Sequence, residues 1–216
     1  MKYLLLDVSG TLLHKPVLFS KIDEVLKEFG YFVPLSKVKY HHKLLSETIH
    51  FPDRTDEVFY NYFNAELLLS LGVIPTDEIL KKLFSSCSYL PWEKYEDTIF
   101  LNDLSIPMGI LSNFNNSLED KLVHFFGAIF SDIFVSEVVG VAKPSPQFYQ
   151  HALEKLELLP EEIIYVGDSY KLDFKPANEL GITTFVIDRD GFYPNSESTI
   201  RSLFDLKNKM IKFYHF

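Results

Sequence analysis

Residues 2–13, KYLLLDVSGTLL, contain the pattern from which the fold can be predicted. The apolar run Lys2–Val8 includes one acidic residue, Asp7, and stops at a polar turn. Continuous apolar runs of this kind are typical of strands in a parallel sheet that is covered on both faces. Four more such runs follow in the chain, and they are Ile106–Leu111, residues 128–135, Glu162–Val166 and Ile182–Ile187.

Amphipathic segments separate these apolar runs. Ser117–Phe126, Ser145–Leu158 and Lys171–Leu180 have helical periodicity with start and stop signals at their ends. Strands that alternate with helices predict an α/β fold with a doubly wound, Rossmann-like parallel sheet. Because ligands of such sheets bind at the carboxyl ends of the strands, the polar residues after each run are candidates for chemistry.

Residues 14–95 show a different pattern. They contain helical periodicities and no convincing buried strand, so we expect an all-helical domain at 14–95, inserted into a core made of residues 1–13 and 96–216. The helices predicted in this insert are Leu18–Phe29, Leu35–Ile49, Asp56–Leu71 and Thr76–Ser86.

Composition limits the class of function. The chain has 216 residues, 47% of them hydrophobic, which is enough for a folded protein. A net charge of −9 disfavours nucleic acid and anionic membranes as partners, and no run approaches the roughly 20 apolar residues of a membrane span. The single cysteine, Cys87, excludes an intrachain disulfide. We expect a cytoplasmic monomer or homodimer that binds a small anionic substrate.

The polar residues at the predicted strand ends suit attack on an electrophile that carries an anionic group. Asp7 can act as a carboxylate nucleophile, which divides one displacement into two easier steps. The hydroxyl of Ser112 and the ammonium of Lys143 can stabilise negative charge on the transferred group. Asp168 and Asp173 would repel Asp7 unless a hard cation such as Mg²⁺ lay between them.

In this order and spacing, the clusters resemble the four motifs of the haloacid dehalogenase superfamily. The resemblance implies its Rossmann-like core, and the helical insert fits the cap that some members carry after the first motif. The matching segments are Asp7-Val8-Ser9-Gly10-Thr11-Leu12, Ile110-Leu111-Ser112-Asn113, Val141-Ala142-Lys143-Pro144-Ser145-Pro146, and Val166-Gly167-Asp168-Ser169 with Asp173.

The resemblance also implies a role for each matching residue. Asp7 is the expected nucleophile, assisted by Thr11, Ser112 and Lys143. Substrate is expected to contact Ser112, Asn113 and Lys143. The expected ligands of Mg²⁺ are Asp7, the backbone carbonyl of Ser9, Asp168 and Asp173.

Some of these residues fit one reaction of the superfamily, and others fit a second. Most of its phosphatases carry a second Asp two positions after the nucleophile, where it acts as general acid, but this chain has Ser9. The 2-haloacid dehalogenases lack that Asp, because halide leaves without a proton, and they place a tyrosine where this chain has Tyr149. In them we expect no metal, and Lys143 would pair directly with Asp7 or the later acids.

Against the dehalogenase hypothesis, those enzymes lack an acidic fourth motif, whereas this chain keeps Asp168 and Asp173. They also hold substrate with a cap arginine, and Lys37–His50 contains none. We therefore favour a Mg²⁺-dependent phosphatase of a small phosphorylated metabolite, with a 2-haloacid dehalogenase as the alternative. A protein of low activity that binds a ligand or partner is the third hypothesis.

Overall fold

A computed structural model describes the backbone of residues 2–214 and the side chains of residues 2–210. The chain divides into two compact units. One unit contains the residues up to His14 and those from Lys94 onward, and the other is Lys15–Glu93.

The boundaries of the units differ slightly from those predicted. The sequence pattern predicts His14 and residues 94–95 in the helical insert, whereas the structure groups them with the larger unit. The reason is that β2 (Leu13–His14) pairs with β3 (Glu93–Lys94) in a small two-stranded sheet. The two passages of the chain between the units are therefore tied to each other.

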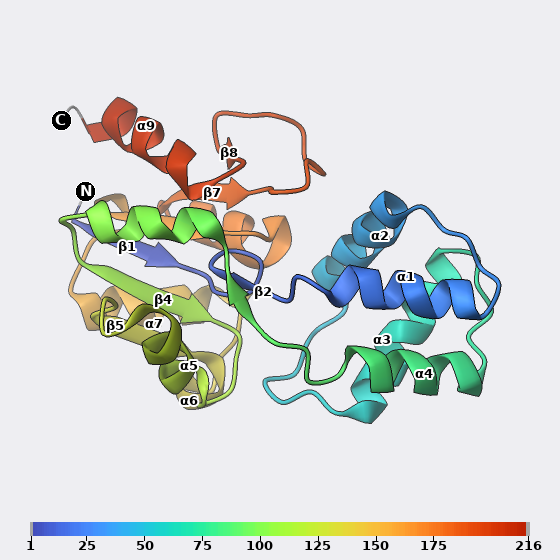
Figure 1. The fold of residues 1–216 in the computed structure, drawn as a ribbon. Coiled ribbons are helices and arrows are strands. Elements are labelled where there is room, and N and C mark those ends of the chain that lie inside the picture. Colours follow the sequence, from blue (N-terminus) through green and yellow to red (C-terminus); the bar gives the residue numbers. More distant parts are fainter. Residues whose placement is uncertain (1, 215–216) are drawn as a thin grey trace. The chain divides into compact units, whose positions relative to one another are not determined.

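The larger unit is built on a six-stranded parallel sheet in the order β5-β4-β1-β6-β7-β8 (Figure 1). The predicted doubly wound sheet is confirmed, although the short last strand was not predicted. Leu6 pairs with Ile110 on one side and with Val166 on the other, so the three central strands end within two residues of one another. The strands are β1 (Tyr3–Leu6), β4 (Met108–Ser112), β5 (Asp132–Val135), β6 (Ile163–Gly167), β7 (Thr183–Ile187) and β8 (Thr199–Ile200).

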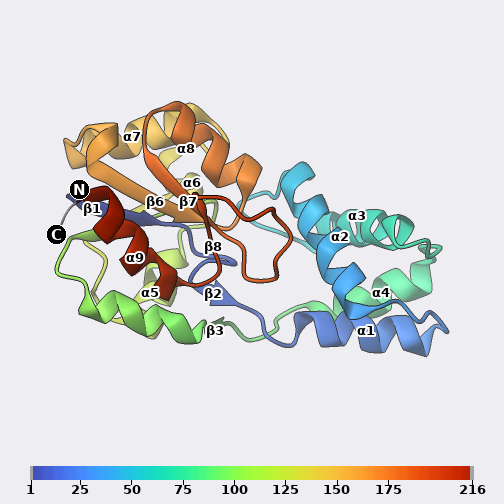
Figure 2. The ribbon, with the colours of Figure 1, turned by 90° about the horizontal axis from the view of Figure 1, so that it is seen from above.

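Helices cover both faces of this sheet, which explains the continuous apolar runs. Tyr3 and Leu5 point to the face covered by α7 and α8, where they join a core with Phe148 and Ala177. Figure 2 shows α7 and α8 on one side of the sheet and α9 on the other. The helices of this unit are α5 (Leu118–Phe126), α6 (Ser136–Val139), α7 (Pro146–Leu156), α8 (Lys175–Glu179) and α9 (Leu203–Tyr214), with 3₁₀ helices at Glu96–Asp103 and Pro160–Glu162 and a π-helical turn at Tyr170–Phe174.

The smaller unit consists of α1 (Leu18–Glu28), α2 (Leu35–Thr48), α3 (Glu57–Ser70) and α4 (Asp77–Cys87), close to the predicted helices. They pack around fully buried aliphatic side chains such as Leu26 and Leu67. None of the helices in the described part of the chain has the length and apolar composition that crossing a bilayer requires.

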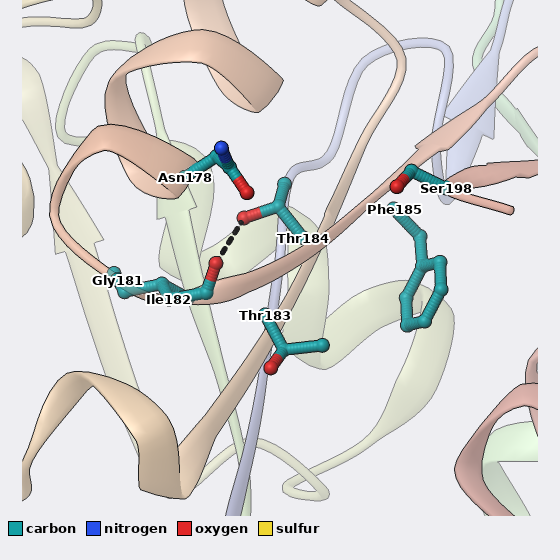
Figure 3. A pocket seen from close by; sticks show the side chains of 7 residues that line it. All are labelled: Asn178, Gly181, Ile182, Thr183, Thr184, Phe185 and Ser198. Atoms are coloured by element: carbon teal, nitrogen blue, oxygen red, sulfur yellow. Dashed lines mark hydrogen bonds between the residues drawn. The ribbon is translucent and has the colours of Figure 1, made fainter. Parts of the chain in front are cut away.

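A hollow of about 230 Å³ lies at the beginning of β7 (Figure 3). Its lining includes Asn178, Ser198 and Thr184, whose hydroxyl donates a 2.9 Å hydrogen bond to the carbonyl of Ile182. Because the strands are parallel, the beginning of β7 is at the amino end of the sheet. The hollow is therefore at the opposite edge from the residues that follow β1, β4 and β6.

Candidate active site

The predicted site residues converge at the carboxyl edge of the sheet. Asp7 directly follows β1, Ser112 is the last residue of β4, and Asp168 directly follows β6. These three strands are neighbours, so their ends bring the three side chains to one place. Lys143 joins them from the loop before α7, and both it and Asp7 are buried, with exposures of 3% and 4%.

Lys143 forms two ion pairs in this buried site. Its Nζ lies 2.7 Å from Oδ1 of Asp7 and 2.6 Å from Oδ1 of Asp173. Burial lowers the pKa of Lys143, but the charges of Asp173 and Asp7 and their hydrogen bonds raise it by more, so the net shift is upward. The side chain therefore stays protonated, and its ammonium contacts Asp7 and Asp173 directly.

Asp7 accepts hydrogen bonds on both carboxylate oxygens. Ser112 Oγ lies 3.3 Å from Oδ1, the oxygen that Lys143 also contacts, and Thr11 Oγ1 lies 3.2 Å from Oδ2. Burial raises the pKa of Asp7 to about 6, with the Lys143 ammonium opposing the rise and the carboxylates of Asp173 and Asp168 adding to it. The site thus orients this carboxylate by three donors that come from separate segments of the chain.

Asp173 is held by groups that the sequence pattern does not indicate. The hydroxyl of Tyr165 donates to Oδ1 at 2.6 Å, and the backbone N–H of Ser169 donates to Oδ2 at 2.9 Å. Burial raises the pKa of Tyr165, and Asp173 adds to the shift, so the phenol stays protonated and able to donate. In the sequence, Tyr165 belongs to an apolar strand, and its hydroxyl is the only signal of a polar role.

Asn113 and Tyr149 have structural contacts that sequence reasoning did not predict. The side-chain amide of Asn113 donates to the carbonyl of Lys143 at 2.9 Å and accepts from the N–H of Lys143 at 2.7 Å. It therefore positions the backbone that carries the lysine. The hydroxyl of Tyr149 donates to the carbonyl of Leu172 at 2.5 Å, which ties α7 to the π-helical turn.

Two glycines allow the later carboxylates to approach the loops. A Cβ at Gly10, where φ is +81°, would collide with the carboxylate of Asp168, and a Cβ at Gly167 would collide with that of Asp173. Any larger residue would have to displace these carboxylates. The presence of glycine in the first and fourth motifs therefore has a direct steric reason.

The carboxylates of Asp7, Asp168 and Asp173 form a compact acidic cluster. Each offers an oxygen within 4.8 Å of the others, and the ammonium of Lys143 pairs with two of them, Asp7 and Asp173. Close carboxylates of this number are costly without further positive charge, and an all-oxygen set suits a hard cation. The residues present fit Mg²⁺.

Comparisons with known proteins relate this chain to one group of hydrolases. The sequence profile of the haloacid dehalogenase-like hydrolases matches residues 1–181. The chain is also similar to a glyceraldehyde 3-phosphate phosphatase of Methanocaldococcus jannaschii, with 40% identity over 83 residues, 36% of either chain. The chain thus covers less than two thirds of that relative's length.

Solved structures show the same fold over the whole chain. The magnesium-bound HAD-hydrolase YfnB of Bacillus subtilis has 21% identity and a TM-score of 0.66, covering 96% of this chain and 97% of its own. A 2-haloacid dehalogenase of Pseudomonas syringae has 17% identity and a TM-score of 0.59, covering 99% of each chain. At such identities the likeness establishes the fold alone.

The buried ion pairs predict a pH-dependent loss of stability in a Lys143→Met variant. Without the ammonium, two carboxylates stay buried and uncompensated, so we expect a cost of about 3–5 kcal/mol at pH 8. A carboxyl group whose pKa is raised on folding destabilises the folded protein as the pH rises. The loss of unfolding free energy in the variant should therefore be smaller at pH 5, where Asp7 binds a proton. Urea unfolding at both pH values measures this difference in stability.

Lys155→Met, at an exposed position on α7, is the control for this prediction. Equal stability of the two variants at pH 8 would contradict the prediction.

A double-mutant cycle can establish that Tyr165 belongs to the ion-pair network. Lys143 Nζ lies 3.2 Å from the Tyr165 hydroxyl, which also contacts Asp173. We expect Tyr165→Phe and Lys143→Met to couple by roughly 0.5–3 kcal/mol in free energy of unfolding. The matched change Tyr3→Phe removes a strand hydroxyl that is bonded to Asp132 at the amino end of the sheet, so it should be additive with Lys143→Met within about 0.5 kcal/mol. The same coupling for both tyrosines would be inconsistent with this assignment.

Proposed function

The chain belongs to the haloacid dehalogenase-like hydrolases, and from this we propose that it is a Mg²⁺-dependent phosphatase that acts on a small phosphorylated metabolite. The observation that carries the proposal is the acidic cluster, in which Asp168 brings a carboxylate to Asp7 in addition to the one that Lys143 pairs. The similarity to a glyceraldehyde 3-phosphate phosphatase over 83 residues supports the same reaction class.

In this proposal Asp7 is the nucleophile. One of its oxygens forms a bond to phosphorus as the bond from phosphorus to the leaving oxygen breaks, which gives an aspartyl-phosphate that water then hydrolyses. Lys143 and Ser112 lie beside Asp7 and stabilise the negative charge of the transferred phosphoryl group. Thr11 orients the second oxygen of the nucleophile.

Asp7, Asp168 and the backbone carbonyl of Ser9 are the groups that we propose hold Mg²⁺. Bound there, the cation would offset the negative charge of the phosphoryl group and the carboxylates. We assign Asp173 to the support of Lys143, because both of its oxygens already accept hydrogen bonds from other groups. The exposed side chain of Ser9 has no part in the contribution of its carbonyl.

A 2-haloacid dehalogenase remains the second candidate, and a specific observation favours it. The direct contacts of Lys143 with Asp7 and Asp173 are the arrangement expected for that reaction. Asp7 would then displace halide from the carbon and form an ester, which water hydrolyses. Ser9 suits this chemistry, since the leaving halide needs no proton.

One parallel assay separates these functions. p-Nitrophenyl phosphate is tested with Mg²⁺ or with EDTA, and L-2-chloropropionate is tested for halide release under both conditions. We expect phosphate release that requires Mg²⁺ and is lost in Asp7→Asn. Halide release that is insensitive to EDTA, without phosphatase activity, would establish the dehalogenase. Absence of both activities would favour a protein that binds a ligand or partner.

The residue at position 9 predicts how activity depends on the leaving group. Serine is a poor general acid near neutral pH, so substrates with a poor leaving group should react slowly. Ser9→Asp should raise kcat for an alkyl phosphate such as glycerol phosphate by at least about tenfold. It should change kcat for p-nitrophenyl phosphate far less, because nitrophenolate leaves without a proton.

The control for this prediction is Ser9→Asn, which matches the shape of aspartate but cannot donate a proton as an acid. Steady-state kinetics on both substrates measure the two ratios. An equal gain in the Asn variant would show that the effect does not come from acid catalysis.

A further inference from the structure

Arg189 makes a set of contacts beside the candidate active site that the proposed reaction does not use. It lies in the loop after β7, two residues beyond the end of that strand. Its Nη1 donates to Asp97 at 2.8 Å, and its Nη2 donates to Asp97 at 3.0 Å and to the backbone carbonyl of Thr11 at 2.8 Å. One guanidinium therefore joins the loop after β7 to the loop that follows the nucleophile.

The same guanidinium stacks on an aromatic ring. Its central carbon lies 3.7 Å from the ring centre of Tyr95, whose ring stacks on His14 at 4.0 Å. The N–H of Tyr95 donates to the carbonyl of Leu12 at 3.1 Å. The segment from Leu12 to His14 is thus fixed by backbone and ring contacts at the same place where Arg189 holds Thr11.

Asp97 anchors Arg189 to the rest of the unit. Its side chain is buried, and Oδ2 also accepts a 2.7 Å hydrogen bond from the N–H of Leu203, at the start of α9. Burial raises the pKa of Asp97, but hydrogen bonds from Arg189 and from the Leu203 amide lower it by more. A bidentate arginine–carboxylate pair of this kind has a defined geometry, so Asp97 holds the guanidinium of Arg189 in a fixed position.

Thr11 links Arg189 to the proposed nucleophile, Asp7. The carbonyl of Thr11 accepts from Arg189, and its hydroxyl donates to Oδ2 of Asp7 at 3.2 Å. We propose that Arg189 is a positioning residue for the reaction: by holding Thr11, it keeps the Asp7 carboxylate aimed at the substrate. In its kinetic form the proposal rests on the function proposed above.

The first test compares two arginines that serve the same loop. Arg189→Gln removes the guanidinium that contacts Asp97 and Thr11. We expect kcat to fall at least about tenfold with KM changed by less than about threefold, since a small displacement of a reacting group lowers the rate strongly. Arg201 pairs with Asp188, the neighbour of Arg189, so Arg201→Gln is the matched control. It should lose thermal stability but keep kcat within about twofold of the wild type. A similar loss of kcat in both variants, or in neither, would overturn the proposal.

The second test asks whether Arg189 acts through Thr11. Thr11→Val removes the hydroxyl that contacts Asp7 and keeps the shape of the side chain. If the proposal holds, Arg189→Gln should lower kcat by less than about threefold in the Thr11→Val background, because the two changes break one chain of contacts. Fully additive losses would show that Arg189 acts by another route. If Arg189→Gln does not fold, Arg189→Lys replaces it, since lysine keeps the charge but loses the bidentate contact.

A structural measurement separates this proposal from the proposed function. If the wild type releases halide and not phosphate, the phosphatase proposal fails and the same variants are measured by halide release. If it has neither activity, crystal structures of the wild type and Arg189→Gln are compared. We expect the Thr11 Oγ1 to Asp7 Oδ2 distance to increase from 3.2 Å to beyond hydrogen-bond range. An unchanged distance would overturn the inference about Arg189.

Discussion

The ammonium of Lys143, buried between the carboxylates of Asp7 and Asp173, is the interaction around which the larger unit is organised. Moving each such ion out of water costs on the order of several kcal/mol, which only close geometry and further hydrogen bonds can offset. Every polar neighbour contributes to that offset. Tyr165 donates to Asp173, and the amide of Asn113 fixes the backbone of the lysine.

The parallel sheet makes such a concentration of charge possible. β1, β4 and β6 end within two residues of one another, so residues far apart in the sequence meet at one edge without a long loop. The helices on the two faces bury the strands, and the charged groups of the site gather where the strands end. Gly10 and Gly167 then leave the space that Asp168 and Asp173 occupy. Fold and site are therefore two consequences of the same geometry.

The site is richer in charge stabilisation than in acid catalysis. Lys143, Ser112 and Thr11 surround the Asp7 carboxylate with donors, whereas position 9, where most phosphatases of the superfamily carry an acid, has a serine. Such a site lowers the energy of a negatively charged transition state but leaves the departing group to take its own proton. Measuring how activity depends on the leaving group therefore distinguishes the candidate reactions of this chain better than measuring which anion binds.

Much of this protein followed from local sequence pattern. The apolar runs predicted five strands of the sheet, because a strand that is buried on both faces is apolar at almost every position. The 3.6-residue periodicity predicted the four helices of the smaller unit, because a helix that is buried on one face is apolar only at every third or fourth position. The motif residues Asp7, Ser112, Lys143 and Asp168 were identified because each stands close to a predicted strand end or helix start, and Asp173 follows Asp168 within the same motif.

Only the tertiary structure could decide the partners of these residues. Tyr165 resembles any apolar strand residue until the register of β6 places its hydroxyl on Asp173. Arg189 and Asp97 stand 92 positions apart, and no periodicity links them to Thr11. The pairing of β2 with β3 likewise moved the boundary between the two units. A sequence records which groups a chain carries, whereas hydrogen bonds and ion pairs depend on distances of a few ångströms that exist only once the chain has folded.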